Sequence, residues 1–174
     1  MFELWTPLRD IPAGGREFSF SEPAIWTSAW EEFGLDCVMA EPLKAEVMLL
    51  PGQDGCLIRG RITGSVTVPC GCCTEDATIV LEHEFDEFEP FPEPGDAGPD
   101  ATGLMRGFGE DAEVDVAGLL WEQFQLALPD KPLCREDCKG LCPTCGVNLN
   151  ETTCDCAEDE GDPRLAALRN IKLT

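Results

Sequence analysis

The sequence has no tyrosine, a single histidine and few basic residues. Its 174 residues include 12 Lys and Arg against 34 Asp and Glu, giving a formal net charge of -22. Nucleic-acid binding depends on Lys and Arg at the phosphates, so this balance disfavours direct RNA binding. A basic protein is the partner that the charge favours. The alternative is that the acidity only keeps the chain in solution.

Long apolar runs and catalytic signatures are also missing. No run approaches the roughly 20 apolar residues that span a bilayer, so no membrane segment is expected. Residues 1–5 show no basic cluster before an apolar stretch, which predicts a cytoplasmic protein. There is no Gly-rich phosphate loop, G-x-S-x-G or H-E-x-x-H motif. A cysteine nucleophile would need His83, which we expect to pack on a strand face, so the sequence predicts a non-enzyme.

Periodicity predicts an α+β fold, a mainly antiparallel β-sheet with a few short helices, and a cysteine-rich C-terminal module follows it. An apolar stripe with a period of 3.6 residues predicts a helix from Ser21, as the N-cap, to Gly34, as the stop. Alternation of apolar and polar residues predicts half-buried strands. The expected strands cover 47–50, 56–68 and 77–86, with a turn at 51–55 and a hairpin tip at 69–76.

The second half of the chain carries its strongest negative charge. Residues 75–115 hold 14 acidic residues and one basic residue, Arg106. Within this stretch we expect a flexible acidic loop at about 90–110, which either meets a basic partner or remains a solvated loop without contacts. A short strand or helix entry is expected at 111–116, a helix around 119–128 that ends before Pro129, and a last helix from Asp162.

Eleven cysteines in close pairs indicate metal binding rather than a disulfide framework. Cys142, Cys145, Cys154 and Cys156 form C-x2-C and C-x-C pairs, and Gly146 permits the tight turn after the first pair. Four thiolates complete a tetrahedral, closed and therefore structural zinc site. An iron–sulfur cluster, or a disulfide-bonded or thiol-only state, remains open from spacing alone.

The remaining paired cysteines suggest a second zinc site that pins the C-terminal module to the sheet. It would consist of Cys70 and Cys73 at the hairpin tip with Cys134 and Cys138, and Cys72 is a possible substitute ligand. Cys37 and Cys56 are expected to be small buried residues. Residues 1–130 then form a β-rich domain, and 131–174 form the cysteine module with the last helix, packed as one unit.

Three motifs give the chain a family resemblance. The segments 139–150, 154–156 and 162–168, together with the C-x2-C pair at Cys70 and Cys73, resemble the YceD-like family, the large ribosomal RNA subunit accumulation proteins of bacteria and plastids. Cys72 departs from the family pattern, which has a basic or polar residue there. The resemblance implies a non-enzymatic factor for 23S rRNA accumulation and large-subunit biogenesis.

The charge adds a hypothesis about how such a factor would act. A chain this acidic suits contact with a basic ribosomal protein or assembly factor better than contact with naked rRNA. Two other interpretations remain open. One is a thiol redox or metal-handling protein that uses the C-x2-C cysteines, although thioredoxin-like cysteines begin a helix and these lie on a hairpin. The other is an acidic mimic of nucleic acid.

Overall fold

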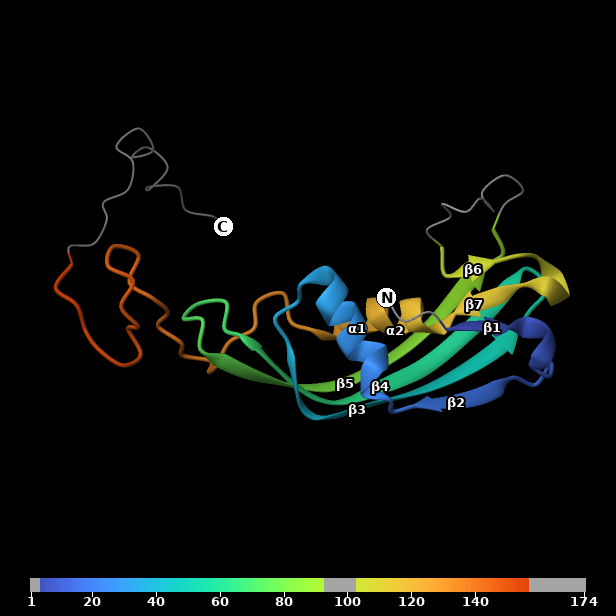
Figure 1. Ribbon diagram of the computed structural model, residues 1–174, viewed down its shortest axis with the longest axis horizontal. Coiled ribbons are helices and arrows are strands. Elements are labelled where there is room, and N and C mark those ends of the chain that lie inside the picture. Colours follow the sequence, from blue (N-terminus) through green and yellow to red (C-terminus); the bar gives the residue numbers. More distant parts are fainter. Residues whose placement is uncertain (1–3, 93–102, 157–174) are drawn as a thin grey trace, which may run out of the picture.

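The computed structural model describes residues 4–92 and 103–156, and it confirms the α+β class (Figure 1). Its main element is a four-stranded antiparallel sheet in the order β2-β3-β4-β5. The strands are β2 (Arg16–Phe20), β3 (Val38–Pro51), β4 (Gly55–Pro69) and β5 (Asp76–Pro90).

A smaller antiparallel sheet covers one end of the large one. It has the order β1-β7-β6, and two short 3-10 helices border it. Its elements are β1 (Trp5–Pro7), η1 (Leu8–Asp10), β6 (Met105–Arg106), η2 (Gly109–Asp111) and β7 (Glu113–Asp115). This sheet joins the start of the described chain to the segment before the second long helix.

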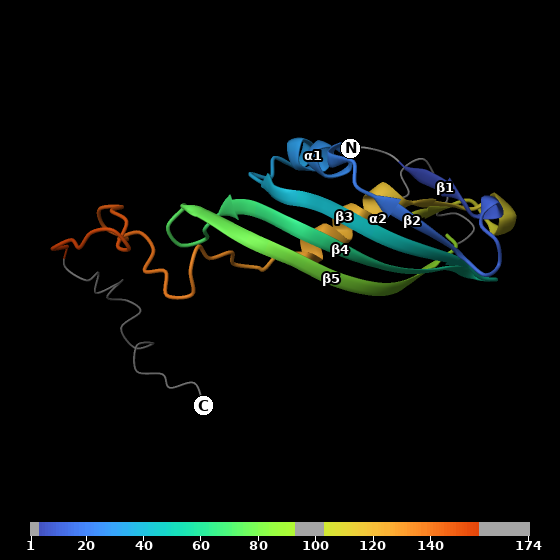
Figure 2. The same ribbon diagram turned by 90° about the horizontal axis from the view of Figure 1, so that it is seen from below.

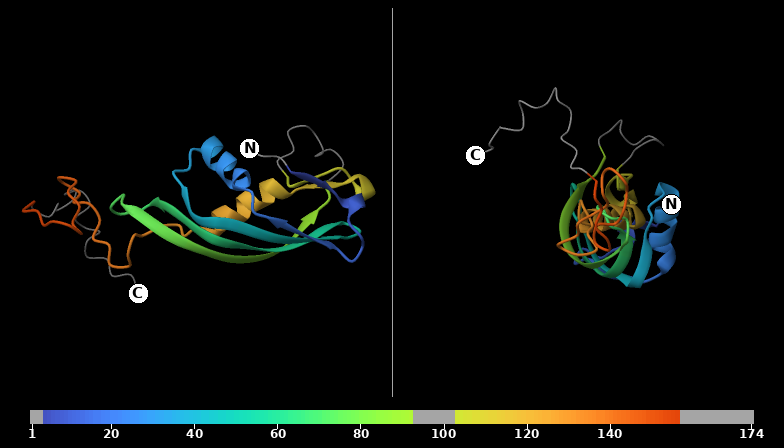
Figure 3. Two further views of the ribbon diagram at one scale, coloured as in Figure 1. Left: turned by 60° about the horizontal axis from the view of Figure 1, so that its bottom comes forward. Right: turned by 90° about the vertical axis from the view of Figure 1, so that its left-hand side faces the viewer.

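Two helices lie in the concave face of the large sheet, which curves around them (Figure 3). They are α1 (Pro23–Phe33) and α2 (Val116–Ala127). The ring of Phe124 in α2 packs against the rings of Trp26 and Trp30 in α1, with centroids 5.9 and 5.6 Å apart. Burying such large rings supplies much of the hydrophobic stabilisation of the core. Among the described residues, neither helix is long and apolar enough to cross a membrane.

The alternating pattern explains the sheet. Ile58, Ile62 and Val66 of β4 are buried on the concave face, and Leu81 and Phe85 of β5 join them there. The predicted strands are therefore correct, and the predicted turn at 51–55 is confirmed by the hydrogen bond from the Gly52 N–H to the Gly55 carbonyl.

Several local expectations need correction. The helix begins after Glu22, and no side chain caps it, so Ser21 is not the N-cap. Gly34 does end α1, in the left-handed conformation that glycine favours. Phe33 lies outside the core with 56% of its surface exposed, and its ring stacks on that of Trp121. β1, β2 and the first half of β3 were not predicted, because short or bulged strands give little periodic signal.

The acidic segment is only partly a loop. Residues 93–102 lie outside the described residues, but Leu104 and Met105 are buried and β6 pairs with β7. The expected entry at 111–116 is β7. The helix after it begins at Val116 with Asp115 as its N-cap, and it ends at Ala127 before Pro129. The expected helix from Asp162 lies outside the described residues.

The cysteine-rich segment lies beyond the β4–β5 hairpin, at the far end of the molecule from the small sheet (Figures 1 and 2). After α2, the chain runs back along the sheet to the hairpin tip. The Gly71 N–H donates to the Pro132 carbonyl over 2.7 Å and joins the tip to this returning chain. This arrangement brings the hairpin cysteines to those of the C-terminal module.

Candidate metal centres

The tip of the β4–β5 hairpin forms a tight turn that presents two thiols on one side. The Cys70 N–H donates to the Glu75 carbonyl, and the Thr74 N–H donates to the Cys70 carbonyl. Thr74 has a φ of 63°, the one non-glycine residue with positive φ in the described chain. These bonds close the turn, and Cys70 and Cys73 are both buried at its base.

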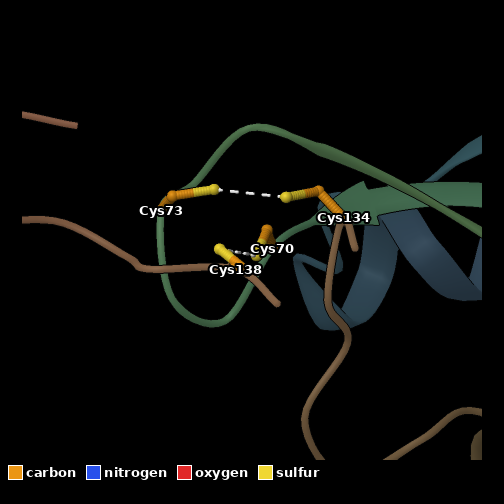
Figure 4. A group of neighbouring side chains, drawn as sticks. All are labelled: Cys70, Cys73, Cys134 and Cys138. Carbon is orange, nitrogen blue, oxygen red and sulfur yellow. Dashed lines mark hydrogen bonds between the residues drawn. The ribbon is translucent and has the colours of Figure 1, made fainter. Parts of the chain in front are cut away.

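Cys134 and Cys138 complete the first cluster, which we call the hairpin cluster (Figure 4). The Sγ atoms of Cys70 and Cys138 are 3.8 Å apart, and those of Cys73 and Cys134 are 3.5 Å apart. All four sulfurs lie within 4.8 Å of one another. A disulfide has an S–S distance of about 2.05 Å, so these separations are those of free thiols around a shared centre.

Hydrogen-bond donors favour the thiolate form of two of the four cysteines in the hairpin cluster, Cys70 and Cys138, whereas the pKa values of Cys73 and Cys134 are raised. Burial opposes ionisation of Cys70, but the backbone N–H groups of Cys134, Cys72 and Cys73 outweigh it and lower the pKa of the Cys70 thiol to about 6. The Asn150 side-chain amide donates to the Cys138 Sγ over 3.4 Å and lowers the pKa of Cys138. Thiolates are the form in which cysteine binds metals.

The second cluster, which we call the knuckle cluster, consists of Cys142, Cys145, Cys154 and Cys156, with sulfurs within 4.8 Å of one another. The Gly146 N–H donates to the Cys142 carbonyl, and Gly146 has a φ of 73°, so glycine suits this turn. The backbone N–H groups of Cys145 and Thr144 point at the Cys142 sulfur and lower the pKa of its thiol to about 6. Cys145 and Cys156 are exposed, so this cluster is more open than the first.

A few hydrogen bonds of the segment between the two clusters connect it to the hairpin tip and to the hairpin cluster. Gly140 has a φ of 73°, and a Cβ there would lie 3.0 Å from the Cys72 carbonyl oxygen, which accepts from the Leu141 N–H. The side chain of Asn150 accepts from the Lys139 N–H while its amide reaches Cys138. Asn150 was not singled out from the sequence. The signal was present in Asn148-x-Asn150, since asparagine side chains often bond nearby backbone in turns.

The other cysteines and the histidine lie outside both clusters. Cys72 sits between two cluster residues, but its thiol contacts Lys131, and this contact is the main cause of the raised Lys131 pKa. Cys56 is buried as expected, whereas Cys37 is only half-buried. His83 packs against α2, where its Nε2 lies 2.9 Å from the Gln123 Oε1.

The structure brings together the two groups of four that were expected, the knuckle cluster from the spacing of its cysteines and the hairpin cluster from the number of paired cysteines that remained. Each group could hold a metal ion. Each offers four sulfur donors and leaves no position for a reacting water, which is the pattern of a structural centre. That these residues bind a metal remains a prediction.

These observations define an α+β protein with two cysteine clusters, one formed between the tip of the β4–β5 hairpin and the C-terminal segment and the other within that segment. The chain belongs to the family described as large ribosomal RNA subunit accumulation protein YceD, which it matches over residues 58–172. No solved structure matches it significantly.

Three curated relatives show the extent of the similarity. A chloroplastic YCED homolog 1 of Arabidopsis thaliana is 33% identical over 63 residues, 36% of this chain and 20% of that protein. Its Zea mays counterpart is 40% identical over 47 residues, 26% of this chain and 16% of that protein. An uncharacterized protein of Mycobacterium tuberculosis is 29% identical over 118 residues, 67% of this chain and 55% of that protein. The chain thus matches about a fifth of the plant relatives and about half of the mycobacterial one.

Proposed function

We propose that this chain is a non-enzymatic factor for 23S rRNA accumulation and large ribosomal subunit biogenesis in the cytoplasm, and that it acts by contact with a basic ribosomal protein or assembly factor. The observation that carries the proposal is the family match over residues 58–172. The family is named for accumulation of the large ribosomal subunit RNA, and the net charge of -22 supports contact through protein rather than RNA.

The pairing of the basic residues supports the same choice of partner. Arg59 binds Asp86 at 2.8 Å and Arg106 binds Glu113 at 2.6 Å. Arg61 pairs with Glu82, and Arg9 pairs with Asp111. These pairs are largely exposed and individually weak. The carboxylate beside each arginine nevertheless offsets its positive charge and repels a phosphate, whereas a basic protein is attracted to the surplus of carboxylates.

Zinc as the metal of both clusters is part of the proposal. Four sulfurs about 2.3 Å from a tetrahedral zinc lie about 3.8 Å from one another, and the two sulfur pairs of the hairpin cluster measure 3.8 and 3.5 Å. In the segment from Lys131 to Cys156, Cys142 is the one buried apolar residue. Zinc would supply the folding free energy that a core supplies elsewhere.

The proposal has a direct test. A tagged chain is cross-linked in cells, digested with nuclease and purified. We expect basic ribosomal or assembly proteins to remain attached, and depletion of the chain to lower the ratio of 23S to 16S rRNA. Recovery of RNase-sensitive RNA without any ribosomal protein would contradict the contact mechanism. An unchanged rRNA ratio would contradict the role in accumulation.

A further inference from the structure

Strand β5 is an edge strand with unpaired backbone groups. It is 15 residues long and pairs with β4 over its whole length without a bulge. No strand of the described chain pairs with its other side, and β5 forms one rim of the sheet (Figures 2 and 3). Natural edges of this length are usually shortened, bulged or covered, because they can accept another strand.

The hydrogen bonds at the two ends of the hairpin identify the unpaired groups. The Cys70 N–H donates to the Glu75 carbonyl at one end, and the Phe91 N–H donates to the Asp54 carbonyl at the other. In an antiparallel ladder such bonded pairs alternate with unbonded ones. Odd-numbered residues of β5 therefore bond with β4, and even-numbered residues direct their N–H and C=O groups to the open rim.

The same even-numbered residues place their side chains on the face of the sheet opposite the helices. From Val80 onward this row has an apolar side chain at each end and three acidic side chains between them. Val80 and Phe88 are 76% and 53% exposed. The row reads Val80, Glu82, Glu84, Asp86 and Phe88.

The row specifies the strand that fits beside it. We propose that the open edge of β5 binds an extended basic segment of a partner protein as a fifth strand, with an apolar–basic–basic–basic–apolar row at every second position. Main-chain hydrogen bonds give affinity in such strand addition, and alternate side chains give specificity. A second copy of this chain would set Glu82, Glu84 and Asp86 near like charges, so the acids select against self-pairing.

This inference rests on the proposed function, which supplies the basic protein partner, and it names the surface that would meet it. Arg59 and Arg61 of β4 pair with Asp86 and Glu82, whereas Glu84 between them has no ion-pair partner among the described residues. Glu84 is therefore the acid of this row that a basic side chain of the partner strand would stabilise most. Residues of the partner strand that face the helices would be small, because α2 lies beside the inner face of β5.

The test uses the full chain loaded with zinc and the synthetic peptide Val-Thr-Lys-Thr-Lys-Thr-Lys-Thr-Val. Binding is measured by calorimetry for this peptide and for two versions that are N-methylated at alternate residues. N-methylation keeps the charge but removes a donor. We expect one methylated version to bind at least about tenfold more weakly and the other to bind nearly as the parent, since only alternate N–H groups face β5.

Protein variants locate the binding. Glu84→Lys should weaken the peptide several-fold, whereas Glu31→Lys, an equal charge change on α1, should have little effect. Amide exchange of even-numbered β5 residues should slow when the peptide is bound. Equal binding of both methylated peptides, equal effects of the two variants, or no binding would overturn the proposal. So would dimerisation through β5, or an RNA oligonucleotide that protects the same amides.

The two proposals fail separately. If the peptide adds with the expected alternation but no ribosomal protein cross-links in cells, strand addition stands and the ribosomal role fails. If ribosomal proteins cross-link but peptide binding lacks this alternation, the ribosomal role stands and the β5 edge is not the contact surface.

Discussion

The Sγ atoms of Cys73 and Cys134 lie 3.5 Å apart although 61 positions separate the two residues in the chain. One belongs to the β4–β5 hairpin and the other to the segment after α2 (Figure 4). A metal held between them would tie the end of the sheet to the cysteine module, so the module's position would depend on the metal.

Replacing one cysteine of a cluster should release the metal of that cluster and leave the metal of the other cluster in place. We expect Cys134→Ser to lower the zinc content from about two ions per chain to about one, because three thiolates hold zinc far more weakly than four. Cys156→Ser should remove the other ion. Cys37→Ser is the control and should leave both. Metal analysis by mass spectrometry after dialysis measures the number of zinc ions per chain. Unchanged zinc content in Cys134→Ser would contradict a metal site at the hairpin cluster.

Asn150→Ala should weaken the hairpin site without removing a ligand. The substitution deletes the amide that donates to the Cys138 Sγ and the oxygen that accepts from the Lys139 N–H. Outer hydrogen bonds of this kind are worth about 10- to 100-fold in metal affinity. Competition with a chromophoric chelator measures the change. Gln125→Ala, which removes an exposed amide from α2, should have no effect; equal affinities for both variants would contradict the role of Asn150.

Gly60→Ala should destabilise the sheet by about 1–3 kcal/mol. A Cβ at Gly60 would clash with the Cζ of Phe85 and lie 2.7 Å from the Glu46 carbonyl oxygen, so the buried ring would have to move. Urea unfolding measures the free energy. Gly14→Ala serves as the control, because a Cβ there meets nothing within 4 Å. If both variants unfold at the same urea concentration, the contact with Phe85 is not constraining.

Glu122→Gln should stabilise the protein at neutral pH, by a few tenths of a kcal/mol at this partly exposed site. Burial, and then the charges of Glu87 and Asp115, raise the pKa of Glu122. A carboxyl with a raised folded-state pKa costs stability when ionised, so the cost is present above that pKa and disappears as the pH falls below the unfolded value. Urea unfolding at about pH 8 and about pH 4 tests this. An equal gain at both pH values in Glu122→Gln would refute the explanation.

Local sequence patterns were sufficient to predict the main strands and the close cysteine pairs of the knuckle cluster. Alternation from Cys56 to Val68 and from Ala77 to Phe85 needs no tertiary information, because side chains of a strand alternate between two faces. The close pairs Cys142–Cys145 and Cys154–Cys156 likewise restrict their sulfurs to a small volume. The negative charge that directs the choice of partner is also a property of composition alone.

The distances between segments and the exposed surfaces became known only from the folded arrangement. It showed that Phe33 stacks on Trp121 outside the core, that β2 and the first half of β3 extend the sheet, and that Asn150 reaches Cys138. It also left β5 at an open rim. These features depend on the packing of helices against the sheet and on hydrogen bonds between strands far apart in the chain. Local sequence periodicity does not predict these features, because burial and strand register are fixed only when distant segments pack together.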